Sequence, residues 1–200
     1  MFEGLDEASL AGIIRSASPS QVVHEVLLRR PGESSPIRQA AVLVPLVQVE
    51  NEWRLLYIRR SDQVLDHKGQ VAFPGGSWEE RDASEEETAL RETWEEIGVD
   101  PSDVRVLGRL DRLLTGTGYR ITPVVGILPW PYSFTLSLEE VASVFTIPLT
   151  WLAEPANREV RPFIRDGVSI NVIYFAPYQG ELLWGATARM TMNLINLLRQ

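Results

Sequence analysis

The chain has 200 residues, of which 44% are apolar, and it carries a formal net charge of −8 with no cysteine. This length and apolar content predict one ordinary globular domain with a core of its own. The acidic balance argues against a general nucleic-acid binder, which needs a basic surface. The lack of cysteine excludes disulfides, thiolate metal sites and a cysteine nucleophile.

The same composition predicts a cytoplasmic protein without a membrane or nucleic-acid partner. No apolar run approaches the length that spans a bilayer. The acidic start Met1–Glu7 lacks the basic and then apolar layout of a signal peptide. Six tryptophans in one small domain leave room for an apolar interface and hence a homodimer, although no segment of the sequence locates that interface.

Hydrophobic periodicity and turn signals divide the chain into strands and helices. The predicted strands are residues 40–49, 53–59, 71–73, 104–114, 119–128, 174–175 and 182–184. The predicted helices are residues 6–16, 85–97, 138–145 and 187–198. Pro45 within the first strand implies a sheet edge or a bulge, because proline cannot donate to a sheet ladder.

This order of elements predicts the fold class. Strands precede, flank and follow helices without a regular βαβ repeat, so we expect an α/β (α+β) fold with a mixed sheet sandwiched between helices. Turn chemistry in residues 31–36 predicts a linker. We therefore assign residues 1–35 to an N-terminal helix and linker extension, and residues 36–200 to the main domain.

The most informative helix is residues 85–97. Ser84, followed three residues later by Glu87, forms a capping-box pattern at its start. Gly98 is placed to end the helix in a left-handed conformation. The apolar residues at helical spacing that we expect to face the core are Leu90, Trp94 and Ile97.

The same helix carries a cluster of carboxylates. Glu92, Glu95 and Glu96 stand at i, i+3 and i+4 and therefore project from one helix face. An oxygen-only set of this density suits a hard cation such as Mg²⁺ or Mn²⁺, whereas the simpler reading is a solvated acidic surface. Arg91 lies within helical reach of Glu87 and Glu95 and could orient one carboxylate.

The context of this helix favours the metal site. Phe73-Pro74-Gly75-Gly76, a loop, and then Arg91-Glu92-x-x-Glu95-Glu96-x-Gly98-Val99 resemble the Nudix box. The loop is one residue longer than the family pattern, with Gly76 and Asp82 in the places of its first Gly and Glu, and Thr93 replaces an aliphatic residue.

The resemblance implies a Nudix hydrolase domain over residues 36–200 and hydrolysis of a nucleotide diphosphate derivative. It further implies that one to three divalent ions, Mg²⁺ or Mn²⁺, are held by the Gly76 carbonyl and by Glu92, Glu95 and Glu96. A general base outside the box is implied at Glu140, with Glu139 as the fallback. Their simpler reading is that of surface carboxylates.

Segments outside the box are similar to those of coenzyme A diphosphatases. They are Arg60-Ser61, residues 67–76 (HKGQVAFPGG), residues 118–126 and residues 184–189. The subfamily pattern has Thr where Ile58 stands and Arg where Leu65 stands. The resemblance implies that coenzyme A is cleaved to 4′-phosphopantetheine and adenosine 3′,5′-bisphosphate.

Such an enzyme needs cations for the phosphates of its substrate. The candidate substrate-binding residues are Arg59, Arg60, His67, Lys68, Gly75 and Gly76. The lone Lys68 beside His67 is the strongest candidate for the 3′-phosphate, and Trp78 could stack on adenine. Two alternatives stay open: a Nudix hydrolase of ADP-ribose or another nucleotide diphosphate derivative, and a non-catalytic Nudix-fold ligand sensor.

Overall fold

The computed structural model describes Phe2 and residues 5–17, 24–25, 36–64, 67–165 and 167–199. The helices are α1 (Glu7–Ser16), α2 (Glu85–Ile97), α3 (Leu149–Ala153) and α4 (Gly185–Leu198), with 3₁₀ turns at Pro101–Asp103 and Pro155–Asn157. The strands are β1 (His24–Glu25), β2 (Arg38–Val49), β3 (Glu52–Arg60), β4 (Val71–Ala72), β5 (Gly75–Ser77), β6 (Arg105–Arg109), β7 (Leu113–Leu114), β8 (Tyr119–Ile127), β9 (Val141–Pro148), β10 (Arg158–Arg165) and β11 (Val168–Phe175).

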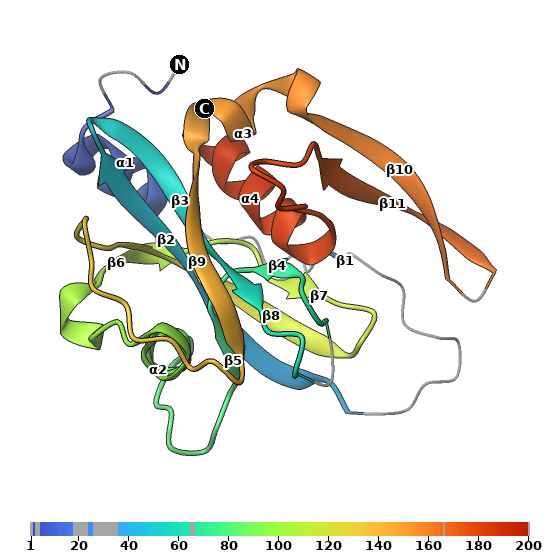
Figure 1. Ribbon diagram of the computed structural model, residues 1–200, viewed down its shortest axis with the longest axis horizontal. Helices are drawn as coiled ribbons and strands as arrows, with labels where there is room; N and C mark the ends of the chain where they lie inside the picture. Colours follow the sequence, from blue (N-terminus) through green and yellow to red (C-terminus); the bar gives the residue numbers. More distant parts are fainter. Residues whose placement is uncertain are drawn as a thin grey trace.

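A mixed sheet forms the centre of the fold (Figure 1). Its main path is β1-β7-β8-β2-β3-β4, and β5, β6 and β9 pair with β2, β8 and β3 respectively. The long pair β2 and β8 is parallel, and β2 runs antiparallel to both β3 and β5. Among the described segments, no helix combines the length and apolar character needed to cross a membrane.

Helices cover both faces of this sheet, as the sequence predicted. On one face, α1 and α4 pack against alternate residues of β2 such as Val44 and Leu46. On the other face, α2 packs against Ala41 and Leu43. Because side chains alternate along a strand, β2 contributes to both cores and reads as a continuous buried run. The predicted α/β (α+β) sandwich is therefore confirmed.

The predicted edge or bulge at Pro45 is wrong, since β2 is central in the sheet. On one side Pro45 aligns with Gly126 of β8. On the other side it lies between the pairing to β5, which ends at Val42, and the pairing to β3, which begins at Leu46. The missing N–H of proline therefore falls where β2 changes partners and no ladder bond is needed.

Residues 138–145 form a strand start, so the predicted helix there is wrong. Leu138 is 71% exposed, and β9 runs from Val141 in an antiparallel ladder with β3. Valine, phenylalanine and threonine dominate the segment from Val141 onward, and these residues favour strands. Residues 182–184 do not form the predicted strand; Trp184 makes an isolated bridge with Tyr174.

A hairpin of β10 and β11 forms a separate two-stranded sheet. Figure 1 shows it as the orange and red ribbon that projects beside α4. At its base Phe175 is buried, whereas Val160 and Ile164 along β10 are 62% and 73% exposed. The sequence predicted only the last two residues of this hairpin as a strand.

The core-facing side of α2 agrees with the prediction at Leu90 and Ile97, which pack in the core, and differs at Trp94. Ala89, Thr93, Glu96 and Ile97, at i, i+4, i+7 and i+8, are buried, whereas Trp94 is 56% exposed. The buried stripe also includes a threonine and a glutamate, which apolar spacing alone does not identify. The division at residues 35 and 36 stays a prediction, because residues 26–35, with most of the predicted linker, lie outside the described segments.

The end of α2 is held by a loop from the following segment. Gly98 adopts φ +72°, the predicted left-handed cap. The Thr135 amide donates to the Ile97 carbonyl (3.1 Å), and the Ser137 amide donates to the Glu96 carbonyl (3.0 Å). These bonds satisfy carbonyls that a helix end leaves without partners.

The contact between Gly98 and this loop generates a stability prediction. A Cβ at Gly98 would lie 2.8 Å from the Thr135 Cβ, in addition to the strain of a positive φ. We expect Gly98→Ala to lower the free energy of unfolding by about 1–3 kcal/mol, measured by urea denaturation. The matched control is Gly12→Ala in α1, where a Cβ meets nothing within 4 Å; an equal loss in both variants would contradict the prediction.

Candidate functional site

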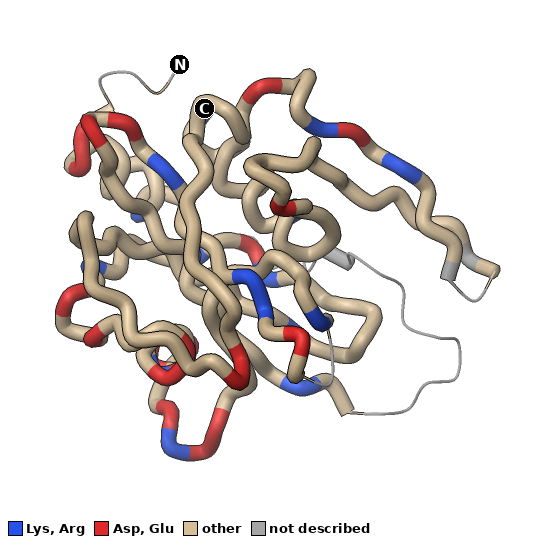
Figure 2. Tube along the Cα trace, viewed as in Figure 1, with Lys and Arg blue, Asp and Glu red and all other residues tan. Residues whose placement is uncertain are grey.

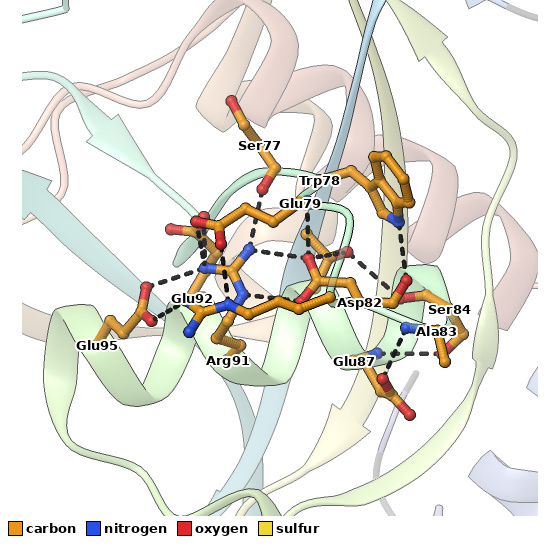
Figure 3. Close-up of polar contacts among 12 residues, drawn as sticks. Ser77, Trp78, Glu79, Asp82, Ala83, Ser84, Glu87, Arg91, Glu92 and Glu95 are labelled. Carbon is orange, nitrogen blue, oxygen red and sulfur yellow. Dashed lines mark hydrogen bonds and ion pairs between the residues drawn. The ribbon is translucent and has the colours of Figure 1, made fainter.

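A buried ion pair joins α2 to the loop that precedes it. The Arg91 Nε donates to Asp82 Oδ1 and a terminal nitrogen of Arg91 donates to Asp82 Oδ2, both at 2.9 Å (Figure 3). The Glu79 amide and the Thr88 hydroxyl also donate to Asp82 Oδ2 at 3.0 Å. These donors, with Arg91 first among them, hold the pKa of Asp82 far below its usual range, and Asp82 in turn raises the pKa of Arg91.

The same guanidinium contacts two of the predicted metal ligands. Arg91 donates to Glu92 Oε1 at 3.0 Å and to Glu95 Oε2 at 2.9 Å, and it also donates to the Ser77 carbonyl at 3.0 Å (Figure 3). Of the two carboxylates within helical reach, Arg91 therefore contacts Glu95. Glu87 instead accepts from the Ala83 amide at 2.8 Å.

Two glycines of β5 form the floor opposite these glutamates. The Gly75 amide donates to Glu96 Oε2 at 3.0 Å. A Cβ at Gly76 would lie 2.4 Å from an oxygen of Glu92, and a Cβ at Gly75 would lie 2.4 Å from the Ala41 carbonyl oxygen. Only glycine lets the strand approach both β2 and the α2 carboxylates this closely.

Glu96 is a buried carboxylate with incomplete charge compensation. It is 1% exposed, and burial raises its pKa to about 8. The Gly75 amide and Arg60, 3.6 Å away, favour the charged form, whereas Glu92 and Glu140 oppose it. Burial likewise raises the pKa of Glu92, against the effect of Arg91. Excess negative potential is thus concentrated between these side chains.

Two of the three predicted glutamate ligands, Glu92 and Glu96, lie where they could hold a hard divalent cation, whereas Glu95 is held by arginines. Glu92 and Glu96 converge near Gly75 and Gly76 of β5, and Glu140 lies near enough to raise the pKa of both. Glu95 is 37% exposed and is held by Arg91 and by Arg81 (3.0 Å). Among the described residues no three carboxylate or histidine side chains stand together as a preformed ligand set. A cation would draw on the concentrated negative potential and on oxygen ligands.

The upstream motif folds back to this cluster. β3 ends at Arg60, whose amide donates to the Gln70 carbonyl at 3.0 Å, and Arg59 aligns with Val71 of β4. This turn brings Arg60 to Glu96. The position of Leu65, where the subfamily pattern has Arg, lies outside the described residues.

The other predicted substrate-binding residues lie around the same turn but have different partners. Arg59 pairs with Glu181 at 3.5 Å. His67 is exposed at φ +59°, with its Nδ1 3.0 Å from the Gln70 side-chain oxygen, and Lys68 is exposed beside it. The structure therefore joins Arg60 to the glutamate cluster and leaves Arg59, His67 and Lys68 at the rim.

The sequence did not predict that Arg81, in addition to Arg60 and Arg91, contacts the glutamates of α2. Arg81, in the loop before α2, contacts Glu79 at 2.8 Å and Glu95 at 3.0 Å. Acidic residues gather along this loop and α2 (Figure 2). A loop longer than the family pattern gives no spacing rule for such a contact, so no signal in the sequence predicted it.

Similarity to known proteins identifies the family of this chain. A NUDIX domain profile matches residues 37–166. The chain belongs to the Nudix family. An uncharacterized Nudix hydrolase, NudL, of Yersinia enterocolitica is 41% identical over 166 residues, which cover 82% of this chain and 84% of that protein. NudL of Yersinia pestis is 40% identical over 161 residues, which cover 80% of each chain.

Solved structures are similar to part of this chain. A crystal structure of a C. elegans Ap4A hydrolase in a binary complex aligns with 57% of this chain and 82% of that chain, at 19% identity and a TM-score of 0.49. The protein is therefore a hydrolase with the Nudix fold, as the resemblance implied. Nudix hydrolases generally use divalent metal cations, which agrees with the charge distribution around Glu92 and Glu96.

The Asp82–Arg91 pair generates a second prediction. Asp82→Asn keeps the shape of the side chain but removes its charge, so we expect a loss of roughly 2–4 kcal/mol in the free energy of unfolding. Because the pKa of Asp82 in the folded state lies below its ordinary value of 3.8, the stabilisation is complete above that pH and is lost as the pH falls through the folded-state pKa.

The measurement is chemical denaturation of wild type and variant at neutral pH and at steps below pH 4. The stability difference should narrow as the pH falls. Glu80→Gln is the matched control, since Glu80 is an exposed residue of the same loop. A difference that stays constant with pH would show that the charge of Asp82 is not what stabilises the loop.

Proposed function

We propose that this Nudix hydrolase cleaves the diphosphate of coenzyme A or its derivatives into 4′-phosphopantetheine and adenosine 3′,5′-bisphosphate. The observation that carries the proposal is the contact of Arg60 with Glu96 beside Gly75 of β5. It joins the segment that is similar to coenzyme A diphosphatases to the glutamates of the Nudix box. A cationic group beside Gly75 and Gly76 is suited to a diphosphate that binds over these two glycines.

In this proposal, Glu92, Glu95, Glu96 and the Gly76 carbonyl hold Mg²⁺ or Mn²⁺. A divalent cation supplies neutralisation of the diphosphate charge and activation of a water molecule. The Gly75 amide and Arg60 position the Glu96 carboxylate, and Arg91 positions those of Glu92 and Glu95. Their contacts fix the side chains before substrate arrives, so little reorganisation is needed during the reaction.

Glu140 is the proposed general base. Its backbone is fixed by the Ser61 amide, which donates to the Glu140 carbonyl at 2.8 Å, so the start of β9 is tied to the end of β3. The side chain is exposed and faces the same negative region as Glu92 and Glu96. It would accept a proton from water as the oxygen attacks phosphorus, and the bond to the bridging oxygen breaks with its electron pair leaving on the second phosphate.

The substrate assignment leads to a third prediction. We expect metal-dependent release of 4′-phosphopantetheine and adenosine 3′,5′-bisphosphate from coenzyme A, identified by mass spectrometry, with Mg²⁺ or Mn²⁺ and none with EDTA. ADP-ribose and diadenosine tetraphosphate are the comparison substrates. Turnover of ADP-ribose without turnover of coenzyme A would replace the proposal by the alternative Nudix activity. Metal binding without turnover of any substrate would favour a ligand sensor.

The role of Glu96 gives a fourth prediction. Glu96→Gln keeps a side chain that can accept from the Gly75 amide but cannot hold a cation equally well. We expect kcat to fall by about 10²–10⁴-fold while the thermal midpoint stays close to that of wild type, because a carboxyl with a pKa of about 8 is mostly protonated at neutral pH and glutamine has nearly the same shape. Glu50→Gln, in the exposed turn at the far end of β2, is the control. Wild-type activity in Glu96→Gln would refute the assigned site.

A further inference from the structure

Arg120 stands apart from most arginines that the structure describes. Arginines such as Arg54, Arg91 and Arg109 have carboxylate partners. Such pairing is expected in a chain of net charge −8, where carboxylates outnumber basic side chains. Within the described residues the Arg120 guanidinium makes no hydrogen bond or ion pair, and its Nε is buried without a partner. A buried donor without an acceptor costs free energy that a bound anion would restore.

The sheet register places Arg120 beside the glutamate site. Arg120 of β8 aligns with Gln39 of β2, and the Gln39 carbonyl accepts from the Trp78 amide at 3.0 Å. Arg120, Gln39 and Trp78 therefore form a row across neighbouring strands. The next row is Thr122, Ala41 and Gly76, the glycine under Glu92.

The side chains of this row lie on the α2 face of the sheet, and the surface between its two ends is exposed to solvent. Ala41 and Val124 belong to the core beneath α2, and side chains two residues apart on a strand share a face, so Gln39 and Arg120 point to that side. Gln39 is exposed and Trp78 is 45% exposed, so solvent reaches the surface between Trp78 and Arg120. Two strand spacings, about 10 Å, separate the backbones at the two ends of the row.

We propose that Arg120 and Trp78 form the subsite for the 3′-phosphoadenosine end of the substrate, with Arg120 on the 3′-phosphate and Trp78 against the base. This inference rests on the proposed coenzyme A diphosphatase function. The diphosphate over Gly76 separates two groups, and the 3′-phosphate is carried by the same ribose that bears the diphosphate. A guanidinium one row away from Gly76 can therefore receive it with paired N–H donors.

The other candidate for the 3′-phosphate is the rim on the far side of the cluster. There Arg59 is paired with Glu181, and His67 lies against Gln70. Lys68 is a point charge in water, whereas Arg120 carries a donor that is already out of water. The proposal thus assigns the adenosine to the Trp78 side and the pantetheine arm to the Lys68 side.

The test compares ligands that differ only in the 3′-phosphate. We would measure kcat/KM for coenzyme A and for 3′-dephospho-coenzyme A, and binding of adenosine 3′,5′-bisphosphate and AMP by calorimetry with Mg²⁺. We expect wild type to prefer the 3′-phosphorylated member of each pair by about 10-fold or more, as a charged hydrogen bond provides. Arg120→Gln should remove this preference, and Arg120→Lys should restore part of it.

Two further variants serve as controls for Arg120. Arg15→Gln, which removes an exposed arginine of α1 on the opposite face, should keep the preference. Lys68→Gln tests the rival side: loss of the preference in that variant with retention in Arg120→Gln would overturn the proposal, as would the lack of any preference in wild type. If coenzyme A is not hydrolysed at all, the proposed function fails, and the binding comparison alone then decides whether Arg120 reads a 3′-phosphate.

The base contact has its own matched pair. Trp78→Ala should weaken binding of adenosine 3′,5′-bisphosphate and AMP by similar factors, about 5-fold or more. Trp94→Ala removes a comparably exposed tryptophan from α2 and should leave both affinities unchanged. Equal affinities in wild type and Trp78→Ala, with unaltered thermal midpoints, would show that the base does not lie on Trp78.

Discussion

The ion pair between Asp82 and Arg91 is the constraint on which the site depends. It fixes the loop before α2, and the same guanidinium then reaches Ser77, Glu92 and Glu95. Loss of either partner would leave a charge in a largely water-free position, which is far more costly than loss of a surface pair. The positions of Glu92 and Glu95 therefore depend on one ion pair.

Burying neighbouring carboxyl groups at the site is unfavourable, and apolar burial in the rest of the fold offsets this cost. Glu96 is buried next to Glu92, and its pKa is raised to about 8. The surrounding cores, with α1 and α4 on one face of the sheet and α2 on the other, supply apolar burial elsewhere. Such local instability is typical of a binding site that a ligand completes, because a bound cation stabilises the charged form.

Local sequence signals predicted the elements that local chemistry determines. The capping box at Ser84, the left-handed end at Gly98 and the strands β2, β3 and β8 follow from caps, turns and hydrophobic runs. The start of β9 was mistaken for a helix, because Leu138, Val141 and Phe145 fit a helical period while long-range pairing with β3 decides the conformation. Pro45 was misread for a similar reason, since the change of partners along β2 is a property of the sheet.

The candidate site divides in the same way. The glutamates could be named from their spacing, and the resemblance to the Nudix box pointed to Gly76 and Asp82. The contact of Arg60 with Glu96 and the row that contains Arg120 depend on strand register, which no short motif encodes. Trp94 shows that helical periodicity alone also has limits, because this predicted core residue of α2 is exposed to solvent.

The loop that closes the end of α2 has a consequence for motion. Because the amides of Thr135 and Ser137 donate to the last carbonyls of the helix, this loop cannot leave the surface without exposing helix carbonyls. Residues 135–137 and the final turn of α2 should therefore open together, and hydrogen exchange should give their amides a common free energy of opening. Glu96 and the approach to Glu140 lie within that one cooperative unit, so fluctuations of the loop and of the glutamate site are coupled.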